Sequence, residues 1–349
     1  MLLGPLTRRV RNIHMIGIGG AGMSGIAEIL INSGFTITGS DIRTTPVTER
    51  LESLGAHIFV GHAASNVQTC DAVVYSSAVK ADNPEIVAAR ERKIPVIKRP
   101  EMLAELMRMK YGIAIAGTHG KTTTTSMTGQ ALTAGGIDPT IIVGGKVAGF
   151  GGGAKTGHGP YLVLEADEYD RTFLELTPVI AVVTTIDLEH LDCYRDLDDI
   201  RAAFAKFVNK VPFFGSAILC IDDRGVQSIL PSVERRTITY GFSRQADIRA
   251  ENAVFTGLAS KFDVLIDGVA AGTVSLNVPG RHNVRNALAA IAVAREMGVP
   301  FDVAARTLAE FGTVERRVEI KGEVGGIAVV DDYAHHPTET EASLDGARP

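Results

Sequence analysis

The sequence predicts an α/β protein built on parallel β-sheets. Two observations carry this prediction: short apolar runs alternate with amphipathic segments along most of the 349 residues, and two glycine-rich loops each follow an apolar run and open a helix. Such a β–α–β rhythm is typical of parallel strands with helices on both faces of the sheet. The hydrophobic fraction of 45% is enough for buried cores, and the length suggests two or three domains.

Charge and composition exclude several classes of protein. A formal net charge of −5 leaves no basic surface for nucleic acid, and no apolar run approaches the ~20 residues of a membrane span. The N-terminal apolar stub precedes its arginines, which reverses the order of a secretory signal. Cys70, Cys193 and Cys220 have no metal-type spacing and are expected to be buried thiols. We therefore expect a cytoplasmic protein that acts on small molecules, without nucleic-acid or membrane partners.

Residues 1–107 are predicted to form the first domain, around a sheet of parallel strands. Its first loop, Gly17-Ile18-Gly19-Gly20-Ala21-Gly22, fits G-x-G-x-x-G and opens a helix over 23–31. This loop type holds a pyrophosphate against a helix N-terminus, and Asp41, after the next strand, could accept a hydrogen bond from a ribose or from a backbone group. NAD, FAD and UDP-sugars all carry a pyrophosphate, so the loop alone leaves a dehydrogenase open. Strands are expected at 13–18, 35–38, 57–60, 72–75 and 96–97.

Residues 108–312 are predicted to form a second domain that opens with a phosphate-binding loop. The apolar run 113–116 breaks into Gly117-Thr118-His119-Gly120-Lys121-Thr122-Thr123, and a helix follows through Ala134. Free backbone N–H groups and the helix N-terminus favour phosphate, while Lys121 can reach the β and γ oxygens and Thr122 can ligate Mg²⁺. Ile115 stands where the strict pattern has glycine. The loop predicts ATP or GTP binding, for which a hydride-transfer enzyme has no use.

The remainder of this second domain is predicted to be α/β with an antiparallel appendage. The glycine-rich segment 144–159 reads either as a linker or as a substrate-gating loop. The alternating pattern of 246–278 contains turn residues and no helical segment, which predicts antiparallel strands. Other strands are expected at 161–165, 179–184, 217–221 and 236–240.

Acidic and imidazole side chains follow two of these strands. The run Glu165-Ala166-Asp167-Glu168-Tyr169-Asp170 comes after one strand, and Asp187-Leu188-Glu189-His190-Leu191-Asp192 follows another. Parallel sheets present their chemistry at the carboxyl ends of strands. Because Mg²⁺ between ATP phosphates needs a carboxylate, Glu165, nearest the strand end, is the candidate. His190 is a candidate ligand for a second metal ion or a donor to a phosphoryl oxygen.

Two further segments complete the pattern. Asn283 precedes an alanine-rich helix, where it is either a helix cap or a reader of an adenine edge. Residues 313–349 read as two strands, 317–321 and 327–331, followed by Tyr333-Ala334-His335-His336-Pro337 and the start of a helix. These elements are too few to enclose a core and are expected to open a third domain.

Taken in order, these motifs resemble the Mur ligases of peptidoglycan synthesis over nearly the whole chain. The branch of the family that they resemble adds L-alanine to UDP-N-acetylmuramate. The resemblance is carried by the loops and runs already described together with Ser76-Ser77-Ala78, Asn83-Pro84-Glu85, residues 209–215, residues 280–286 and Asp331-Asp332-Tyr333-Ala334-His335-His336-Pro337.

The resemblance implies a fold and a reaction. The expected fold has an N-terminal Rossmann-like domain for the UDP-sugar, a central ATPase domain with a phosphate loop, and the start of a C-terminal Rossmann-like domain. ATP is expected to phosphorylate the lactyl carboxylate of UDP-N-acetylmuramate, and the amine of L-alanine then attacks the acyl phosphate. Both reactants are anionic, so Lys121 and Mg²⁺ must offset charge.

The resemblance also implies roles for individual residues. Catalysis is expected from Lys121, Glu165 and His190, with Thr122 and Glu165 on one Mg²⁺ and His190 by a second. The nucleotide is expected to meet the phosphate loop Gly117 to Thr123, together with Asn283, Asn286, Arg317 and Asp332. The UDP-sugar is expected at Gly17, Gly19, Gly20, Gly22, Asp41, Ser76 and Ser77.

Because the sequence stops at Pro349, we expect UDP-sugar recognition with weakened ATP binding and slow or no turnover.

Two other functions stay open beside the dehydrogenase. One is the related ligase that attaches a preformed tripeptide to the same sugar, against which Glu189-His190-Leu191-Asp192 and residues 209–215 argue. The other is a nucleotide-binding remnant without catalysis.

Overall fold

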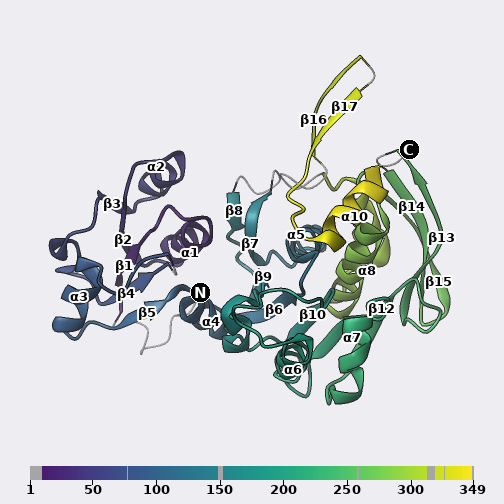
Figure 1. Cartoon of the computed structure of the whole chain (residues 1–349), viewed down its shortest axis with the longest axis horizontal. Coiled ribbons are helices and arrows are strands. Elements are labelled where there is room, and N and C mark those ends of the chain that lie inside the picture. Colours follow the sequence, from purple (N-terminus) through teal and green to yellow (C-terminus); the bar gives the residue numbers. More distant parts are fainter. Residues whose placement is uncertain are drawn as a thin grey trace.

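The computed structural model describes residues 10–76, 78–147, 152–257, 259–312, 319–325 and 327–347. Two α/β units lie side by side, and a short C-terminal segment covers one edge of the second (Figure 1). The first unit has an all-parallel sheet and the second a mixed sheet, which confirms the predicted fold class.

The first unit is a five-stranded parallel sheet in the order β3-β2-β1-β4-β5. The apolar residues of β1 explain its central place, since Ile13, Met15 and Ile16 are buried on both faces. β2 continues to Asp41, three residues beyond the predicted end, and so places the aspartate at the edge of the sheet that holds the glycine loop. The elements are β1 (Asn12–Ile16), α1 (Ala21–Asn32), β2 (Thr36–Asp41), α2 (Pro46–Ser53), β3 (His57–Val60), η2 (Ala64–Val67), β4 (Ala72–Tyr75), α3 (Pro84–Glu91), β5 (Val96–Lys98) and α4 (Arg99–Arg108).

The second unit has a ten-stranded sheet in the order β15-β14-β13-β12-β11-β10-β6-β9-β7-β8. Successive residues of its strands point to opposite faces: Val182 packs with Met127 and Leu288, whereas Val183 packs with Phe204. The strands and helices up to β10 are β6 (Tyr111–Ala116), α5 (Lys121–Ala134), β7 (Thr140–Val147), β8 (Gly152–Lys155), β9 (Tyr161–Glu165), η4 (Tyr169–Glu175) and β10 (Ile180–Val183).

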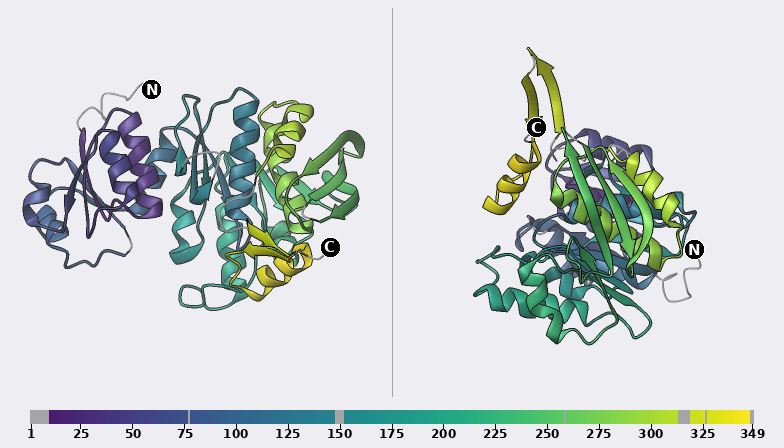
Figure 2. Two further views of the ribbon diagram at one scale, coloured as in Figure 1. Left: turned by 90° about the horizontal axis from the view of Figure 1, so that it is seen from above. Right: turned by 90° about the vertical axis from the view of Figure 1, so that its right-hand side faces the viewer.

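The rest of this unit includes the predicted antiparallel appendage. Strands β13, β14 and β15 are joined antiparallel and continue the sheet from β12, to which β13 is parallel (Figure 2). Helices α5 and α8 pack against each other on one face of the sheet. The elements are α6 (Leu197–Val208), β11 (Ser216–Cys220), α7 (Arg224–Ile229), η5 (Leu230–Ser232), β12 (Thr237–Gly241), β13 (Ile248–Thr256), β14 (Ala259–Ile266), β15 (Val269–Leu276), α8 (Arg281–Glu296) and α9 (Phe301–Ala309).

The glycine-rich segment 144–159 is not simply a linker. Its described parts belong to β7 and β8, which pair antiparallel at the edge of the sheet, while residues 148–151 lie outside the described part of the chain. Two of its glycines permit a close approach, because a Cβ at Gly159 would lie 2.0 Å from the Ile137 carbonyl oxygen and one at Gly157 would lie 2.2 Å from that of Asp138. The composition therefore reflects close backbone packing as well as a loop.

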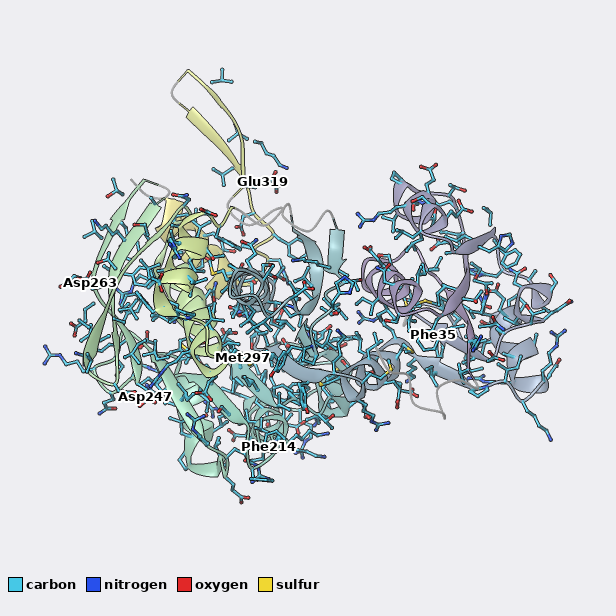
Figure 3. The ribbon with its side chains drawn as sticks, turned by 180° about the vertical axis from the view of Figure 1, so that it is seen from behind. Phe35, Phe214, Asp247, Asp263, Met297 and Glu319 are labelled. Atoms are coloured by element: carbon cyan, nitrogen blue, oxygen red, sulfur yellow. The ribbon has the colours of Figure 1, made fainter. Side chains whose placement is uncertain are left out.

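The C-terminal segment consists of an antiparallel hairpin, β16 (Glu319–Val324) and β17 (Ile327–Asp331), and helix α10 (Pro337–Ala347). The hairpin projects from the body, and Figure 3 shows Glu319 on it, away from the packed interior. Helix α10 lies beside α8.

Two sequence expectations about side chains and membranes can be compared with this fold. All three cysteines are free, but only Cys220 is buried; the expectation was wrong for Cys70 and Cys193, which are half-buried. Among the described residues, no helix is both long and apolar enough to cross a membrane.

Candidate functional site

The first glycine loop connects β1 to α1 and is held by the end of β2. The backbone N–H groups of Gly17 and Ile18 donate to the Ser40 carbonyl oxygen at 2.8 and 3.2 Å. The N–H of Gly19 donates to Oδ2 of Asp41 at 2.8 Å. Asp41 therefore accepts a hydrogen bond from the backbone, one of the two roles that the sequence left open. No side chain caps the N-terminus of α1, whose N-cap is Gly20, so its first amides face outward for an anion.

Two neighbouring side chains complete the surroundings of this loop. Ser76 directly follows β4, and a Cβ at Gly17 would lie 3.4 Å from its Cβ. The strand order changes direction between β1 and β4, where parallel sheets bind ligands, so Ser76 lies at that crevice. Arg99, which the sequence did not single out, packs on Gly22 so closely that a Cβ there would lie 2.3 Å from Nη1. Ser77 lies outside the described residues.

A buried polar network supports the first loop from behind. The carboxylate of Glu85, fully buried, accepts hydrogen bonds from the Ser40 hydroxyl at 2.7 Å and the Asn66 amide at 2.7 Å. His62 Nδ1 lies 2.8 Å and His14 Nε2 3.3 Å from its oxygens. Burial alone would raise the pKa of Glu85, but the hydrogen bonds from His14, Ser40 and Asn66 lower it from 4.5 to about 2. Because Ser40 also holds the glycine loop, the network positions the loop.

We expect Glu85→Gln to remove a pH-dependent part of the stability. Folding lowers the pKa of Glu85. The ionised carboxylate therefore contributes its full share to the free energy of unfolding above pH 4.5, and this contribution is lost as the pH falls towards about 2. A shift of this size corresponds to roughly 3 kcal/mol. Urea unfolding followed by circular dichroism should show that the difference between wild type and variant shrinks between pH 6 and pH 3. A difference that does not vary with pH would contradict this assignment.

The phosphate loop joins β6 to α5. Gly117 and Gly120 have φ of 136° and 84°, and a Cβ at Gly117 would lie 2.1 Å from the Thr184 hydroxyl. The amide of Thr118 donates to the Thr185 carbonyl at 3.0 Å and that of His119 to the Thr185 hydroxyl at 2.9 Å. The amides of these two residues are therefore not among the free N–H groups that the sequence predicted for the loop.

The first turn of α5 offers free amides to an anion. This helix begins at Lys121 after Gly120, and no side chain caps it. The amides at the start of a helix have no partner within the helix, so those of its first turn, which includes Thr122 and Thr123, are available for phosphate.

The ammonium group of Lys121 is held by Glu168. Its Nζ lies 2.8 and 2.7 Å from the two carboxylate oxygens and donates to the Gly117 carbonyl at 2.7 Å. Burial alone would lower the pKa of Lys121, but Glu168 raises it above its usual value, and Lys121 in turn holds the pKa of Glu168 below its usual range despite burial. Both groups are therefore charged. Glu168 belongs to the acidic run that the sequence singled out, but its role was missed.

His190 lies on the other side of the same carboxylate. Its Nε2 is 3.6 Å from Oε1 of Glu168 and 3.9 Å from Oε2 of Glu189. The neighbouring carboxylate of Glu168 raises the pKa of His190 above its usual value. One ligand atom from each of Glu168, Glu189 and His190 lies within 4.8 Å of the other two. The structure thus groups the predicted His190 with two carboxylates that were not predicted as metal ligands.

Two separate cavities lie at the N-terminus of α5, one on each side of it. The cavity on the side of the first unit, about 140 Å³ in volume, is lined by Gly22 and Arg99 from that unit and by Lys121, Gly144, Glu165 and Asp167 from the second. The other, about 110 Å³, is lined by His119, Gly120, Thr122 and Thr123 together with residues of α8 and α10. Lys121 therefore faces one cavity, whereas Thr122 faces the other.

The second cavity collects the predicted nucleotide residues. Asn283, Asn286 and Asp332 all line it. The helix-cap interpretation of Asn283 was wrong, because α8 has Gly280 as its N-cap and the Asn283 amide donates to the Pro279 carbonyl at 2.7 Å. Asn286 lies against the phosphate loop, since a Cβ at Gly120 would be 2.7 Å from its Oδ1. Arg317 lies outside the described residues.

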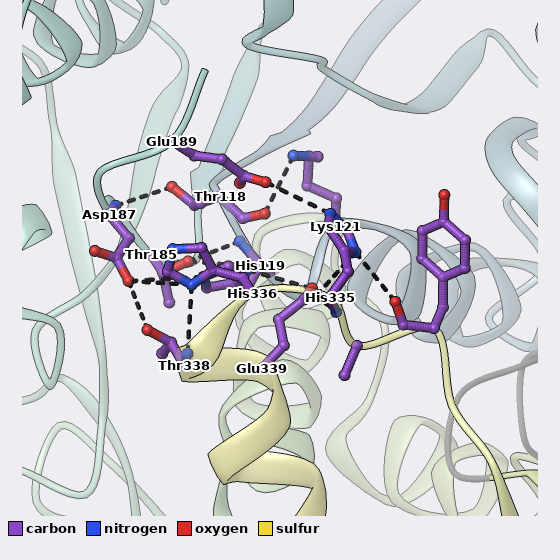
Figure 4. Close-up of polar contacts among 12 residues, drawn as sticks. Thr118, His119, Lys121, Thr185, Asp187, Glu189, His335, His336, Thr338 and Glu339 are labelled. Atoms are coloured by element: carbon purple, nitrogen blue, oxygen red, sulfur yellow. Dashed lines mark hydrogen bonds and ion pairs between the residues drawn. The ribbon is translucent and has the colours of Figure 1, made fainter. Parts of the chain in front are cut away.

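The C-terminal segment closes over this second cavity. Thr338 donates to Oδ2 of Asp187 at 2.8 Å, and Oε1 of Glu339 is 3.3 Å from Nδ1 of His119 (Figure 4). His335 Nε2 lies 3.6 Å from Oε1 of Glu189. A helix from the end of the chain thus contacts both the phosphate loop and the acidic run after β10.

Comparison with known proteins agrees with this arrangement. Residues 12–111 match the family described as "Mur ligase family, catalytic domain", and residues 115–294 match "Mur ligase middle domain". A UDP-N-acetylmuramate–L-alanine ligase of Salinibacter ruber is 58% identical over 98% of this chain and 72% of its own length. One from Anaeromyxobacter dehalogenans is 57% identical over 97% of this chain and 74% of its own.

Solved structures give the same picture. The UDP-N-acetylmuramate–alanine ligase of Thermotoga maritima matches with a TM-score of 0.83 at 33% identity, over 96% of this chain and 77% of its own. A murein peptide ligase of Psychrobacter arcticus matches with a TM-score of 0.82 at 30% identity, over 97% of this chain and 76% of its own.

Proposed function

The chain belongs to the Mur ligase family, and from this premise we propose that it is an ATP-dependent ligase that joins L-alanine to UDP-N-acetylmuramate in peptidoglycan synthesis. One observation supports the proposal most strongly: the N-terminus of α5 lies between two cavities, with Lys121 facing one and Thr122 facing the other. A helix N-terminus there can hold the triphosphate of ATP on one side while a carboxylate approaches from the other.

The residues divide between the two substrates in this proposal. Gly17, Gly19, Gly20, Gly22 and Asp41 form the diphosphate loop, with Ser76 and Ser77 beside it. The triphosphate lies on the cradle of Gly117 to Thr123, and Asn283, Asn286, Arg317 and Asp332 surround the nucleoside. We also propose that the domains meet between residues 107 and 108 and between residues 312 and 313. We place the protein in the cytoplasm, where ATP is available.

The chemistry requires that a carboxylate become an electrophile. Transfer of the γ-phosphoryl group to the lactyl carboxylate gives ADP and an acyl phosphate, and attack by the amine of L-alanine then releases phosphate and forms the amide. Lys121 lies at the place where the anionic carboxylate and the triphosphate meet, so its charge offsets their repulsion. Arg99 adds a second cation to the same cavity.

The donor set fits magnesium, the ion that we propose for this site. The hydroxyl of Thr122 and the carboxylate of Glu165 are oxygen donors that face the two cavities at the start of α5. A second group consists of His190 with the carboxylates of Glu168 and Glu189. Bound Mg²⁺ would supply positive charge to the phosphoryl oxygens. Lys121, Glu165 and His190 are the proposed catalytic residues.

We expect Arg99→Ala to weaken UDP-N-acetylmuramate binding. Arg99 lies on Gly22, at the N-terminus of α1, and faces the cavity shared with Lys121. Loss of a charge-assisted hydrogen bond costs about 1.5–3 kcal/mol, so Kd should rise roughly 10- to 100-fold. Calorimetry with the UDP-sugar measures it, and Arg92→Ala, an exposed arginine at the end of α3, is the control. An unchanged Kd for Arg99→Ala would remove Arg99 from the site.

The second candidate function is that of the related ligase, which attaches a preformed tripeptide to UDP-N-acetylmuramate. Solved murein peptide ligases match this fold nearly as well as the alanine ligase, whereas the curated relatives at 55–58% identity are alanine ligases. Phosphate release with UDP-N-acetylmuramate and ATP should therefore be stimulated by L-alanine and not by L-alanyl-γ-D-glutamyl-meso-diaminopimelate. Stimulation by the tripeptide alone would favour the second candidate.

A further inference from the structure

We propose that His119, Asp187 and His336 form a binding site for a divalent transition-metal ion of the Zn²⁺ type. The site would tie the phosphate loop to the C-terminal segment. It goes beyond the proposed ligase reaction, whose magnesium ligands are Thr122, Glu165 and His190.

Three separate parts of the chain supply the donors. His119 lies in the phosphate loop, Asp187 follows β10 and His336 directly precedes α10, and their side chains converge in Figure 4. Oδ2 of Asp187 is 3.7 Å from Nε2 of His119 and 3.9 Å from Nδ1 of His336, and the three ligand atoms lie within 4.8 Å of one another. Tetrahedral zinc with bonds of ~2.0–2.1 Å has donor–donor edges of roughly 3.4 Å, so the two edges to Asp187 would shorten by roughly 0.3–0.5 Å.

Nε2 of His119 lacks a hydrogen-bond partner. Both ring nitrogens of His119 are buried and neither makes a hydrogen bond, although Nδ1 lies 3.3 Å from Oε1 of Glu339. Its backbone is fixed, since its N–H donates to the Thr185 hydroxyl at 2.9 Å and its carbonyl accepts from Thr184. A buried polar group without a hydrogen bond costs about 1–3 kcal/mol. A metal ion on Nε2 would supply the missing interaction.

The groups around these three side chains are arranged like the outer hydrogen-bond partners of metal ligands in other proteins. Oε1 of Glu339 lies 3.3 Å from Nδ1 of His119, where a carboxylate orients a ligating imidazole. The Thr338 hydroxyl donates to Oδ2 of Asp187 at 2.8 Å and leaves that oxygen another lone pair. The Thr338 amide donates to Nδ1 of His336 at 3.3 Å, a long hydrogen bond that shows this nitrogen to be an acceptor and that an ion would replace.

The donor set selects the class of ion. Two imidazoles and one carboxylate, with a fourth position open, suit Zn²⁺, Co²⁺ or Ni²⁺, whereas Mg²⁺ prefers oxygen ligands. The nearby group of Glu168, Glu189 and His190 differs, because two of its three donors are carboxylates, which suit Mg²⁺ better. Since His119, Thr338 and Glu339 all line the nucleotide cavity, a bound ion would hold α10 over it.

The test is a titration of the 349-residue chain with Co²⁺ in the absence of nucleotide. We expect the visible absorption of one tetrahedral Co²⁺ per chain, displaced by Zn²⁺ but not by excess Mg²⁺. His119→Ala and His336→Ala should each weaken binding by more than the ~100-fold typical of an outer partner, and Glu339→Gln by ~10- to 100-fold. The matched control is His158→Ala, which removes an exposed histidine of the second unit; it should leave the affinity unchanged, as should His190→Ala.

Two results would overturn the proposal: unchanged Co²⁺ affinity in His336→Ala, or loss of the signal in His190→Ala. Hydrogen exchange provides a readout that does not depend on the alanine variants. Zn²⁺ should slow exchange in 337–347 of the wild-type chain, and Glu339→Gln should reduce this effect. Absence of slowing in the wild type would equally contradict the site.

Discussion

Lys121→Ala is expected to abolish ATP-dependent phosphorylation of UDP-N-acetylmuramate, although the protein should still bind the UDP-sugar through its first glycine loop. The ammonium group faces the cavity shared by the two units and is charged, since Glu168 raises its pKa despite burial. It lies where two anions must approach each other, so its removal leaves their repulsion uncompensated. We expect the rate of ADP formation to fall by at least about 10³-fold. A coupled assay for ADP measures this loss.

The control for this prediction is Lys206→Ala, which removes an exposed lysine near the end of α6. Its ADP formation should equal that of the wild type. Calorimetry should show that Lys121→Ala still binds UDP-N-acetylmuramate, because the diphosphate loop belongs to the other unit, with a Kd raised by the lost contact to the lactyl carboxylate. If Lys121→Ala retained most of its activity, phosphoryl transfer at this loop would be ruled out.

Glu168→Gln is expected to cause the second largest loss. Glu168 is almost completely buried and contacts Lys121 at 2.7 Å and His190 at 3.6 Å, so a neutral amide would release both side chains from their positions. Glu168 is a positioning residue, since it acts through these two side chains. We expect kcat to fall roughly 10²- to 10³-fold, the range seen when one preorganised electrostatic partner is removed. Steady-state kinetics with varied ATP separates kcat from KM.

A purely structural role for Glu168 would give a different pattern. Glu168→Asp keeps the charge and should recover part of kcat, whereas loss of stability alone would lower the fraction of active enzyme equally in both variants. Glu175→Gln, an exposed glutamate at the end of η4, is the matched control and should behave as the wild type. Wild-type kcat in Glu168→Gln would refute the positioning role.

Local pattern was sufficient for much of the fold. Strands such as 57–60, 72–75 and 161–165 were predicted with their observed bounds, because apolar runs between glycine and polar turns depend on nearby residues alone. The two glycine loops were found for the same reason. The glycine-rich segment 144–159 was harder, since its close approaches to the Ile137 and Asp138 carbonyls depend on tertiary packing.

The partners within the site could not be read from the sequence. Which carboxylate of the run 165–170 reaches Lys121 depends on the path of the chain after β9, where Glu168 contacts Lys121 and the nearby residues Asp170 and Arg171 adopt φ of 51° and 58°. Arg99 and Glu85 act on residues that are distant in the sequence: Arg99 in α4 contacts Gly22 in α1, and Glu85 in helix α3 contacts Ser40 in strand β2. Asn283 looked like a cap because it precedes a helix, but Gly280 already begins that helix.

The central claim is that one helix N-terminus serves two substrates, and a crystal structure with UDP-N-acetylmuramate and a non-hydrolysable ATP analogue tests it most directly. The account predicts the diphosphate on the loop from Gly17 to Gly22 and the triphosphate on the first turn of α5. It also predicts the lactyl carboxylate in the cavity lined by Arg99 and Lys121, on the opposite side from the nucleoside. A carboxylate bound outside that cavity, or a triphosphate away from α5, would contradict it.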